Sequence, residues 1–174
     1  MGSEGRLLVV DANVLIDYVA ADETILSLAT RFMGTIQVPR LILNEVDQLA
    51  ETDCDRLGLR VVEASLEQLE EARQGSKGLS FNDRICLILA RDSGWTCVTN
   101  DRALRKACEK ISVSVLWGLE LMLDLVAGGH LALESALQVA RAIQATNPRH
   151  ITAEILDRFE QKASLTKPPT PAER

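Results

Sequence analysis

Short apolar stretches alternate with segments of helical periodicity along most of this chain. Five runs rich in aliphatic and β-branched residues predict β-strands at residues 7–10, 35–38, 59–63, 96–99 and 112–116. Helical patterns lie between them, at residues 13–20, 23–33, 39–49, 65–73, 81–92 and 102–110. Strands that alternate with helices are joined by parallel crossovers. The pattern therefore predicts an α/β fold, a three-layer α/β/α sandwich with a central five-stranded parallel sheet.

The residues beyond the last predicted strand show only helical patterns. From residue 118 to about 163 apolar side chains recur at helical spacing, with breaks at Gly128-Gly129 and Asn147-Pro148. These breaks predict extra C-terminal helices that complete the core, and a groove for a partner helix or a dimer face is the alternative. The length of 174 residues fits one domain over residues 1–165, with a disordered lead at 1–5 and a flexible tail at 166–174.

The composition narrows the possible functions. A formal charge of −6 and an aromatic content of 3% argue against a broad polyanion-binding coat and against a base-stacking platform. His130 and His150 have no metal-ligand spacing and are expected at the surface, which disfavours a histidine triad or a catalytic zinc. Cys86 and Cys97 fall in apolar runs and no C-x-x-C pair is present, which favours a reducing, cytoplasmic compartment. The apolar run at 7–10 is too short for a signal peptide or a membrane span.

Three acidic side chains lie at predicted helix starts. Asp11 follows the first predicted strand and Asp101 follows the fourth, so both lie at carboxyl ends of parallel strands, where such sheets bind ligands. Each is also a plausible helix N-cap. Asp83 can form a capping box with Ser80, but it shares a helical face with apolar residues and is expected to point toward packed protein.

Glu45 has the least obvious structural role. It falls inside the predicted helix at 39–49, beside Ile42 and Val46 on the helical wheel. A carboxylate on an apolar edge costs free energy unless it is paired or bound to a metal, and Arg40 lies on another part of the wheel. We therefore expect Glu45 to be available to join the other three acids.

Four carboxylates from four elements could converge on one pocket. Without a cation, their repulsion would raise at least one pKa, and a hard divalent cation removes that penalty. Mg²⁺ and Mn²⁺ prefer oxygen ligands, so a set of acids without histidine suits one or two such ions. A site of this kind can activate a water and stabilise charge on a phosphodiester.

These acids lie in motifs that resemble the PIN-domain family. The motifs are Asp11-Ala-Asn13-Val-Leu-Ile, Asn44-Glu45-Val46, Leu79-Ser-Phe-Asn-Asp83 and Val98-Thr-Asn-Asp101-Arg, in this order over about residues 7–117. The resemblance implies a metal-dependent ribonuclease with a core at about residues 6–117 and a helical extension at 118–165. It implies that the catalytic and metal-binding residues are Asp11, Glu45, Asp83 and Asp101. Asn13 and Thr99 would support the metal or its water.

The resemblance also implies partners. Many bacterial and archaeal PIN proteins are toxins of VapBC type, which are often dimeric and are held inactive by a cognate antitoxin. It therefore implies an RNA substrate, a possible antitoxin protein and a homodimer, and no membrane. The helices of residues 118–165 are more loosely similar to extensions found in some members.

Two other functions remain open from the sequence. One is a PIN-like regulatory module that binds metal or RNA without catalysis. The other is an α/β phosphatase of the haloacid-dehalogenase type, which is disfavoured because Asn13 stands where a second aspartate would shuttle the proton. Residues 75–78 lack the spacing of a phosphate-binding P-loop.

The remaining polar and aromatic residues receive ordinary assignments. Basic side chains near the acids could contact an RNA backbone, but each alone is expected to be a solvated charge: Lys77, Arg102, Arg105 and Lys106. Four further acids are expected to face solvent: Asp17, Asp22, Asp53 and Asp55. Trp95 and Trp117 border predicted strands and are expected to pack against the core.

Overall fold

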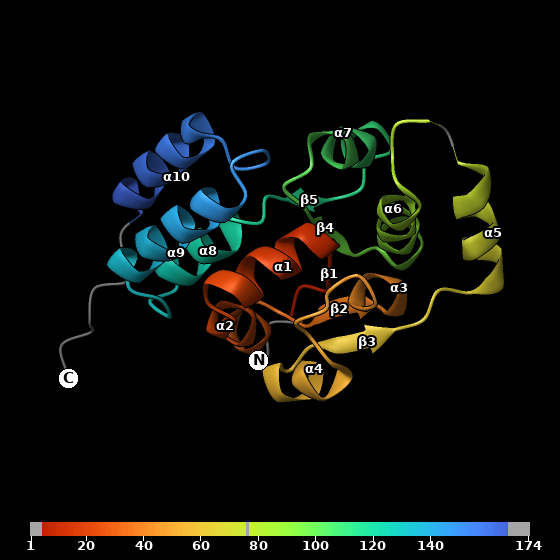
Figure 1. Cartoon of the computed structure of the whole chain (residues 1–174), viewed down its shortest axis with the longest axis horizontal. Helices are drawn as coiled ribbons and strands as arrows, with labels where there is room; N and C mark the ends of the chain where they lie inside the picture. Colours follow the sequence, from red (N-terminus) through yellow and green to blue (C-terminus); the bar gives the residue numbers. More distant parts are fainter. Residues whose placement is uncertain (1–4, 76, 167–174) are drawn as a thin grey trace.

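A five-stranded sheet, parallel throughout, forms the centre of the computed structural model, which describes residues 5–75 and 77–166 (Figure 1). The strands are β1 (Leu8–Val10), β2 (Ile36–Pro39), β3 (Arg60–Val62), β4 (Thr96–Val98) and β5 (Val115–Leu116). The predicted α/β/α sandwich with extra C-terminal helices is confirmed. Most of the predicted disordered lead and flexible tail, residues 1–4 and 167–174, lies outside the described residues.

Helices fill every connection between the strands. The first crossovers contain α1 (Ala12–Ala21), α2 (Thr24–Phe32), α3 (Arg40–Leu43) and α4 (Glu51–Leu57). The later ones contain α5 (Leu66–Gln74), α6 (Phe81–Ser93) and α7 (Arg102–Lys110). The C-terminal helices are α8 (Glu120–Ala127), α9 (Leu133–Thr146) and α10 (Ala153–Leu165), and they are separated near the predicted breaks. No helix in the described part of the chain has both the length and the apolar character needed to cross a membrane.

The direction of strand addition reverses beside β1. The sheet order is β3-β2-β1-β4-β5, so the chain builds toward one edge and then returns to the other side of β1. Because parallel crossovers are right-handed, helices of the two halves cover opposite faces. The contacts agree, since α6 packs on β1 and β4 beside α5 and α7, whereas α2 packs on β2 beside α4 and α8. The carboxyl ends of β1 and β4 therefore border the switch point of the sheet.

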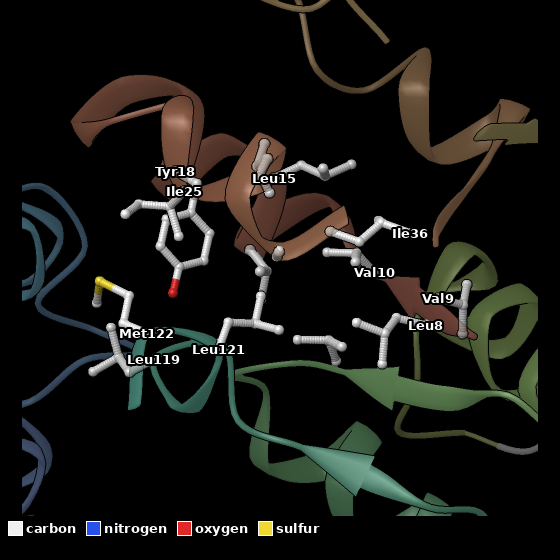
Figure 2. Packing of buried hydrophobic residues seen from close by; sticks show 14 of the residues in the cluster. Leu8, Val9, Val10, Leu15, Tyr18, Ile25, Ile36, Leu119, Leu121 and Met122 are labelled. Carbon is white, nitrogen blue, oxygen red and sulfur yellow. The ribbon is translucent and has the colours of Figure 1, made fainter. Parts of the chain in front are cut away.

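The core joins the sheet to the C-terminal helices. The three residues of β1 are fully buried, as expected for a central parallel strand whose two faces are both covered. Figure 2 shows Tyr18 of α1 near Leu121 and Met122 of α8, and Leu15 of α1 belongs to the same buried cluster. The Tyr18 hydroxyl donates a hydrogen bond of 2.5 Å to the Gly118 carbonyl. The stripes of α8, α9 and α10 thus complete the core, as predicted.

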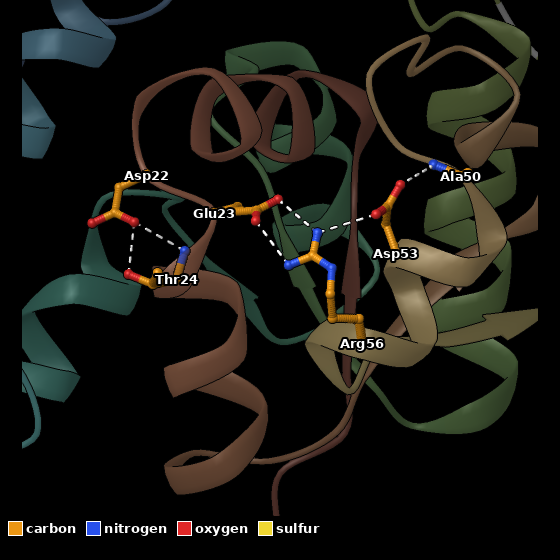
Figure 3. A network of polar contacts seen from close by, with 6 residues as sticks. All are labelled: Asp22, Glu23, Thr24, Ala50, Asp53 and Arg56. Carbon is orange, nitrogen blue, oxygen red and sulfur yellow. Dashed lines mark hydrogen bonds and ion pairs between the residues drawn. The ribbon is translucent and has the colours of Figure 1, made fainter.

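The segment after β2 differs from the prediction. The periodicity of residues 39–49 predicts one helix, but α3 ends at Leu43, turns follow, and a further helix, α4, was missed. Two side-chain contacts stabilise α4: the Asp53 carboxylate accepts the N–H of Ala50 at 3.0 Å, and Arg56 bridges Glu23 and Asp53 (Figure 3). The pair between Arg56 and Glu23 depends on the start of α2 lying beside α4, which local periodicity does not report.

Candidate active site

Asp11 and Asp101 occupy equivalent positions after two neighbouring parallel strands. Asp11 follows β1 and caps α1, where its Oδ1 accepts the N–H of Val14 at 2.8 Å. Asp101 follows β4 and caps α7, where its Oδ1 accepts the N–H of Leu104 at 2.8 Å. The predicted N-cap roles and the predicted positions at strand ends are both confirmed. A cap bond uses only part of the acceptor capacity of a carboxylate, so both groups retain lone pairs for a further ligand.

Thr99 links the two caps. Its side chain is fully buried, its hydroxyl donates to Oδ2 of Asp11, and its Oγ1 accepts the N–H of Asp101 at 2.9 Å. Thr99 thus contacts the carboxylate of Asp11 and the backbone of Asp101. Asn13 lies in the first turn of α1 and is half-buried.

The Asp11 carboxyl group is strongly perturbed. It is only 2% exposed, and burial raises its pKa from 3.8 to about 7. The negative charges of Asp83 and Asp101 raise the pKa further, whereas the hydrogen bonds from Thr99 and Val14 oppose the rise. The three carboxylates are therefore close enough to interact, and burial exceeds their repulsion as the cause of the shift.

Asp83 is both a cap and a member of this group. Its Oδ2 accepts the N–H and the hydroxyl of Ser80 at 3.0 and 2.7 Å, and its own N–H donates to Ser80 Oγ at 3.1 Å. The side chain is half-buried at the start of α6, and its charge acts on Asp11. The predicted capping box is confirmed, and the half-buried side chain is still close enough to Asp11 for their charges to interact.

Glu45 does not occupy the position predicted for it. It lies in a turn after α3 rather than inside a helix, and it is exposed while Ile42 and Val46 are buried. The turn rotates its side chain away from the apolar edge, so the argument from the cost of burial does not apply. Glu45 still lies near the other acids, as the Cys86 thiol shows. Burial is the main cause that raises the pKa of this thiol, and the negative charges of Asp11, Asp83 and Glu45 add to the rise.

The donor set is suited to a hard cation in chemical type. It consists of oxygen ligands, and the repulsion that Asp83 and Asp101 exert on Asp11 is the penalty that a cation would relieve. Within residues 5–75 and 77–166, however, no three His, Cys, Asp or Glu side chains are placed so that they could hold a metal ion. Asp83 is turned toward Ser80 in this conformation. The shared metal site stays a prediction.

Asp17 is a buried acid that the sequence reading missed. The prediction that it faces solvent is wrong, because it is 4% exposed. Its two oxygens accept hydrogen bonds from Asn147 Nδ2 at 3.0 and 3.1 Å, and Oδ2 accepts one from Asn100 at 3.5 Å. Burial raises its pKa to about 6. Its helical spacing with the buried Val14 and Tyr18 is the signal that could have identified it.

Asn100 joins this buried network to the candidate site. It directly precedes Asp101, and its Oδ1 accepts the N–H of Gly118 at 2.9 Å. The Gly118 carbonyl in turn accepts the Tyr18 hydroxyl. These bonds hold α1, the β4–α7 connection and the β5–α8 connection together directly behind Asp101.

The basic residues near the acids divide into two groups. Lys77, Arg102 and Lys106 are exposed, as predicted for solvated charges. Arg105 is not, because it is half-buried with its guanidinium 3.8 Å from the centroid of the Trp117 ring. The described contact of the Trp117 ring is thus with an arginine.

The remaining predictions from the sequence concern the burial of cysteines, histidines, acids and Trp95. Cys86 and Cys97 are buried free thiols, as predicted, and so are Cys54 and Cys108. His130 is exposed and stacks on Phe32, with ring centroids 3.7 Å apart. Five residues remain, of which one is exposed and four are half-buried: Asp55 is exposed, and Asp22, Asp53, His150 and Trp95 are half-buried.

No family model matches this chain, and no curated protein matches it. The resemblance to PIN domains consequently depends on the four motifs and on the positions of their acids.

Proposed function

We propose that this protein is a PIN-type endoribonuclease that requires Mg²⁺ or Mn²⁺. The observation that carries the proposal is the buried Asp11 carboxylate, whose pKa is raised to about 7, at the switch point of a parallel sheet beside Asp83 and Asp101. Perturbed carboxylates that come from separate elements to the ligand-binding end of such a sheet are typical of active sites.

The residues have distinct roles in this proposal. Asp11 and Asp101 are the principal metal ligands, because their cap bonds and Thr99 hold them in fixed orientations. Asp83 completes the set by turning from Ser80, and Glu45 approaches from its exposed turn. A divalent cation bound there would activate a water and neutralise charge on the scissile phosphodiester. Asn13 supports the metal or its water.

The decisive experiment measures RNA cleavage by the full chain. A mixture of fluorescently labelled oligoribonucleotides is incubated with wild type, Asp11→Asn and Asp101→Asn in Mn²⁺ and in EDTA. Cleavage by wild type in Mn²⁺, reduced in both variants to the level seen in EDTA, supports the proposal. The exposed Asp157→Asn on α10 is the matched control and should cleave like wild type. Cleavage that is unchanged in both active-site variants would refute the assignment.

A non-catalytic module that binds metal or RNA is the second candidate. Calorimetric titration with Mn²⁺ alongside the cleavage assay separates the two, because binding without cleavage identifies this candidate. A phosphatase would instead hydrolyse a small phosphate monoester and leave RNA intact.

A toxin role, with a cytoplasmic location, an antitoxin and a homodimer, is a narrower proposal that depends on the family resemblance. A small upstream reading frame encoding a DNA-binding protein would support it. A neighbourhood without such a frame favours a free-standing nuclease. Sedimentation of the purified chain reports directly on the homodimer.

A further inference from the structure

A groove of about 310 Å³ lies between the core and the last helix. One wall carries Arg105 of α7 and Trp117, which directly follows β5. The opposite wall is α10, which contributes Arg158, Phe159 and Lys162. This volume is at the lower end of the range for small-ligand sites, which suits a single nucleotide better than a long polymer segment.

The lining of the groove is more basic than the protein as a whole. It has three basic side chains and one acidic side chain, whereas the chain carries a formal charge of −6. The acidic residue, Glu120, is already engaged, since it pairs with Lys162 at 3.0 Å and accepts the N–H of Trp117 at 3.1 Å. Arg158 pairs, among the described residues, with Glu154 of the preceding turn, at the surface, where such pairs contribute little. The groove is therefore complementary to an anion.

Arg105 is the most informative lining residue. Its guanidinium lies over the Trp117 ring, and its Nε is buried without a hydrogen-bond partner in the described structure. Among the described residues it forms no ion pair. A buried donor without a partner is costly, so a phosphate or base oxygen in the groove would be bound favourably. The stacked ring also holds the guanidinium in place before a ligand arrives.

The groove begins one helical turn from the candidate active site. The backbone N–H of Arg105 donates to the Asp101 carbonyl at 3.1 Å, in the first turn of α7. At a rise of about 1.5 Å per residue, the four-residue step separates the two residues by about 6 Å along the axis. A strand of RNA with one phosphodiester at Asp101 would have its neighbouring nucleotide close to Arg105.

We propose that this groove binds the nucleotide adjacent to the scissile phosphodiester of a single-stranded RNA, a role that rests on the proposed nuclease function. Arg105 and Arg158 contact phosphate oxygens, and the base lies against the apolar side chains between them, including Phe159 and Ile155. A single base needs only one apolar surface to lie against, so the low aromatic content of the chain does not prevent this binding. The uncommitted donors of Arg105 and its closeness to Asp101 favour RNA over a protein segment.

The test measures RNA affinity in EDTA, where a metal-dependent nuclease does not cleave. A fluorescein-labelled 20-nucleotide RNA of random sequence is titrated with wild type, Arg105→Gln, Arg158→Glu and the control Arg73→Glu. Arg73 is exposed on α5, and its reversal changes the net charge as much as that of Arg158. Each groove variant should weaken binding by about tenfold, and the loss of one phosphate contact should lower the salt slope by about 0.7. Because Arg158 is a surface residue, its variant should fold even if Arg105→Gln does not.

Hydrolysis of bis(p-nitrophenyl) phosphate in Mn²⁺ separates this proposal from the nuclease function. The diester is too small to span the groove and the acids, so its hydrolysis by wild type, and at the same rate by the control Arg73→Glu, reports on the acids alone. If the diester is not hydrolysed but the groove variants lose RNA, the groove assignment stands and the nuclease function fails. If groove variants bind RNA as tightly as Arg73→Glu does, the groove proposal is overturned. If the groove variants keep RNA binding but lose binding of an acidic amphipathic peptide, the groove belongs to a protein partner instead.

Discussion

The buried charge of Asp11 predicts an unusual effect of removing it. In the metal-free protein, Asp11→Asn should be stabilised relative to wild type as the pH rises, although it abolishes the proposed activity. Asparagine keeps an acceptor oxygen for the Val14 N–H, so the cap bond is retained. Its amide group faces the Thr99 hydroxyl, which has lone pairs to accept from it. Any remaining cost of these exchanges is the same at every pH.

The magnitude follows from the pKa of Asp11. Burial first, and then Asp83 and Asp101, raise that pKa from 3.8 to about 7. A group with a raised folded-state pKa favours folding below its unfolded pKa and loses that contribution as the pH rises through the folded pKa. At about 1.36 kcal/mol per unit, the ionised group costs about 4 kcal/mol above pH 7 and about 1.7 kcal/mol at pH 5. The stability of Asp11→Asn relative to wild type should therefore increase by about 3 kcal/mol from pH 5 to pH 8.5.

Urea unfolding in EDTA, followed by the fluorescence of Trp95 and Trp117, measures this difference. The exposed Asp157→Asn serves as the control and should track wild type across the pH range. A difference between Asp11→Asn and wild type that is constant from pH 5 to pH 8.5 would refute the argument. Mn²⁺ should narrow the difference at pH 8.5 by about 2.7 kcal/mol, since an ion at 100 times its Kd stabilises only the protein that binds it.

Three further predictions test the surroundings of the site. Asp17→Asn should gain about 2 kcal/mol relative to wild type between pH 4 and pH 7 in urea unfolding, because burial raises the Asp17 pKa to about 6; a pH-independent difference contradicts this. Thr99→Val removes the hydroxyl between Asp11 and Asp101 and should lower RNA cleavage by about 10- to 100-fold without unfolding the chain, and wild-type kinetics would exclude a supporting role. Leu121→Ala, at a fully buried position, should lower the free energy of unfolding by about 3 kcal/mol, whereas Leu121→Met should cost far less; a loss below about 1 kcal/mol would show that α8 is not part of the core.

The local features of the fold could be predicted from neighbouring residues. The apolar run of β1 predicts a strand of the parallel sheet, and the strand is fully buried. Asp11 and Asp101 cap the helices that follow them, and Ser80 and Asp83 form a capping box. Each of these structures depends on hydrogen bonds or side-chain periodicity within about four residues, so the information lies next to the residue concerned.

The environments of the polar groups were decided by distant segments. Asp17 is buried beside Asn147, which is 130 residues away in the chain. The side-chain amide of Asn147 donates a hydrogen bond to its carboxylate. The helix predicted around Glu45 ends early, which leaves that side chain exposed. Arg105 is covered by Trp117 and faces α10.

By itself, the sequence determined the α/β class, the succession of strands and helices, and the placement of Asp11 and Asp101 at strand ends. Only the tertiary structure decided which acids are desolvated, which carboxylates interact, and where a basic groove opens beside them. The physical reason is range: capping and periodicity act over one helical turn, whereas desolvation and charge interaction depend on all segments that pack around a group. Thr99 and Asp11 are 88 residues apart in the chain, and the adjacency of β1 and β4 in the sheet brings them into contact.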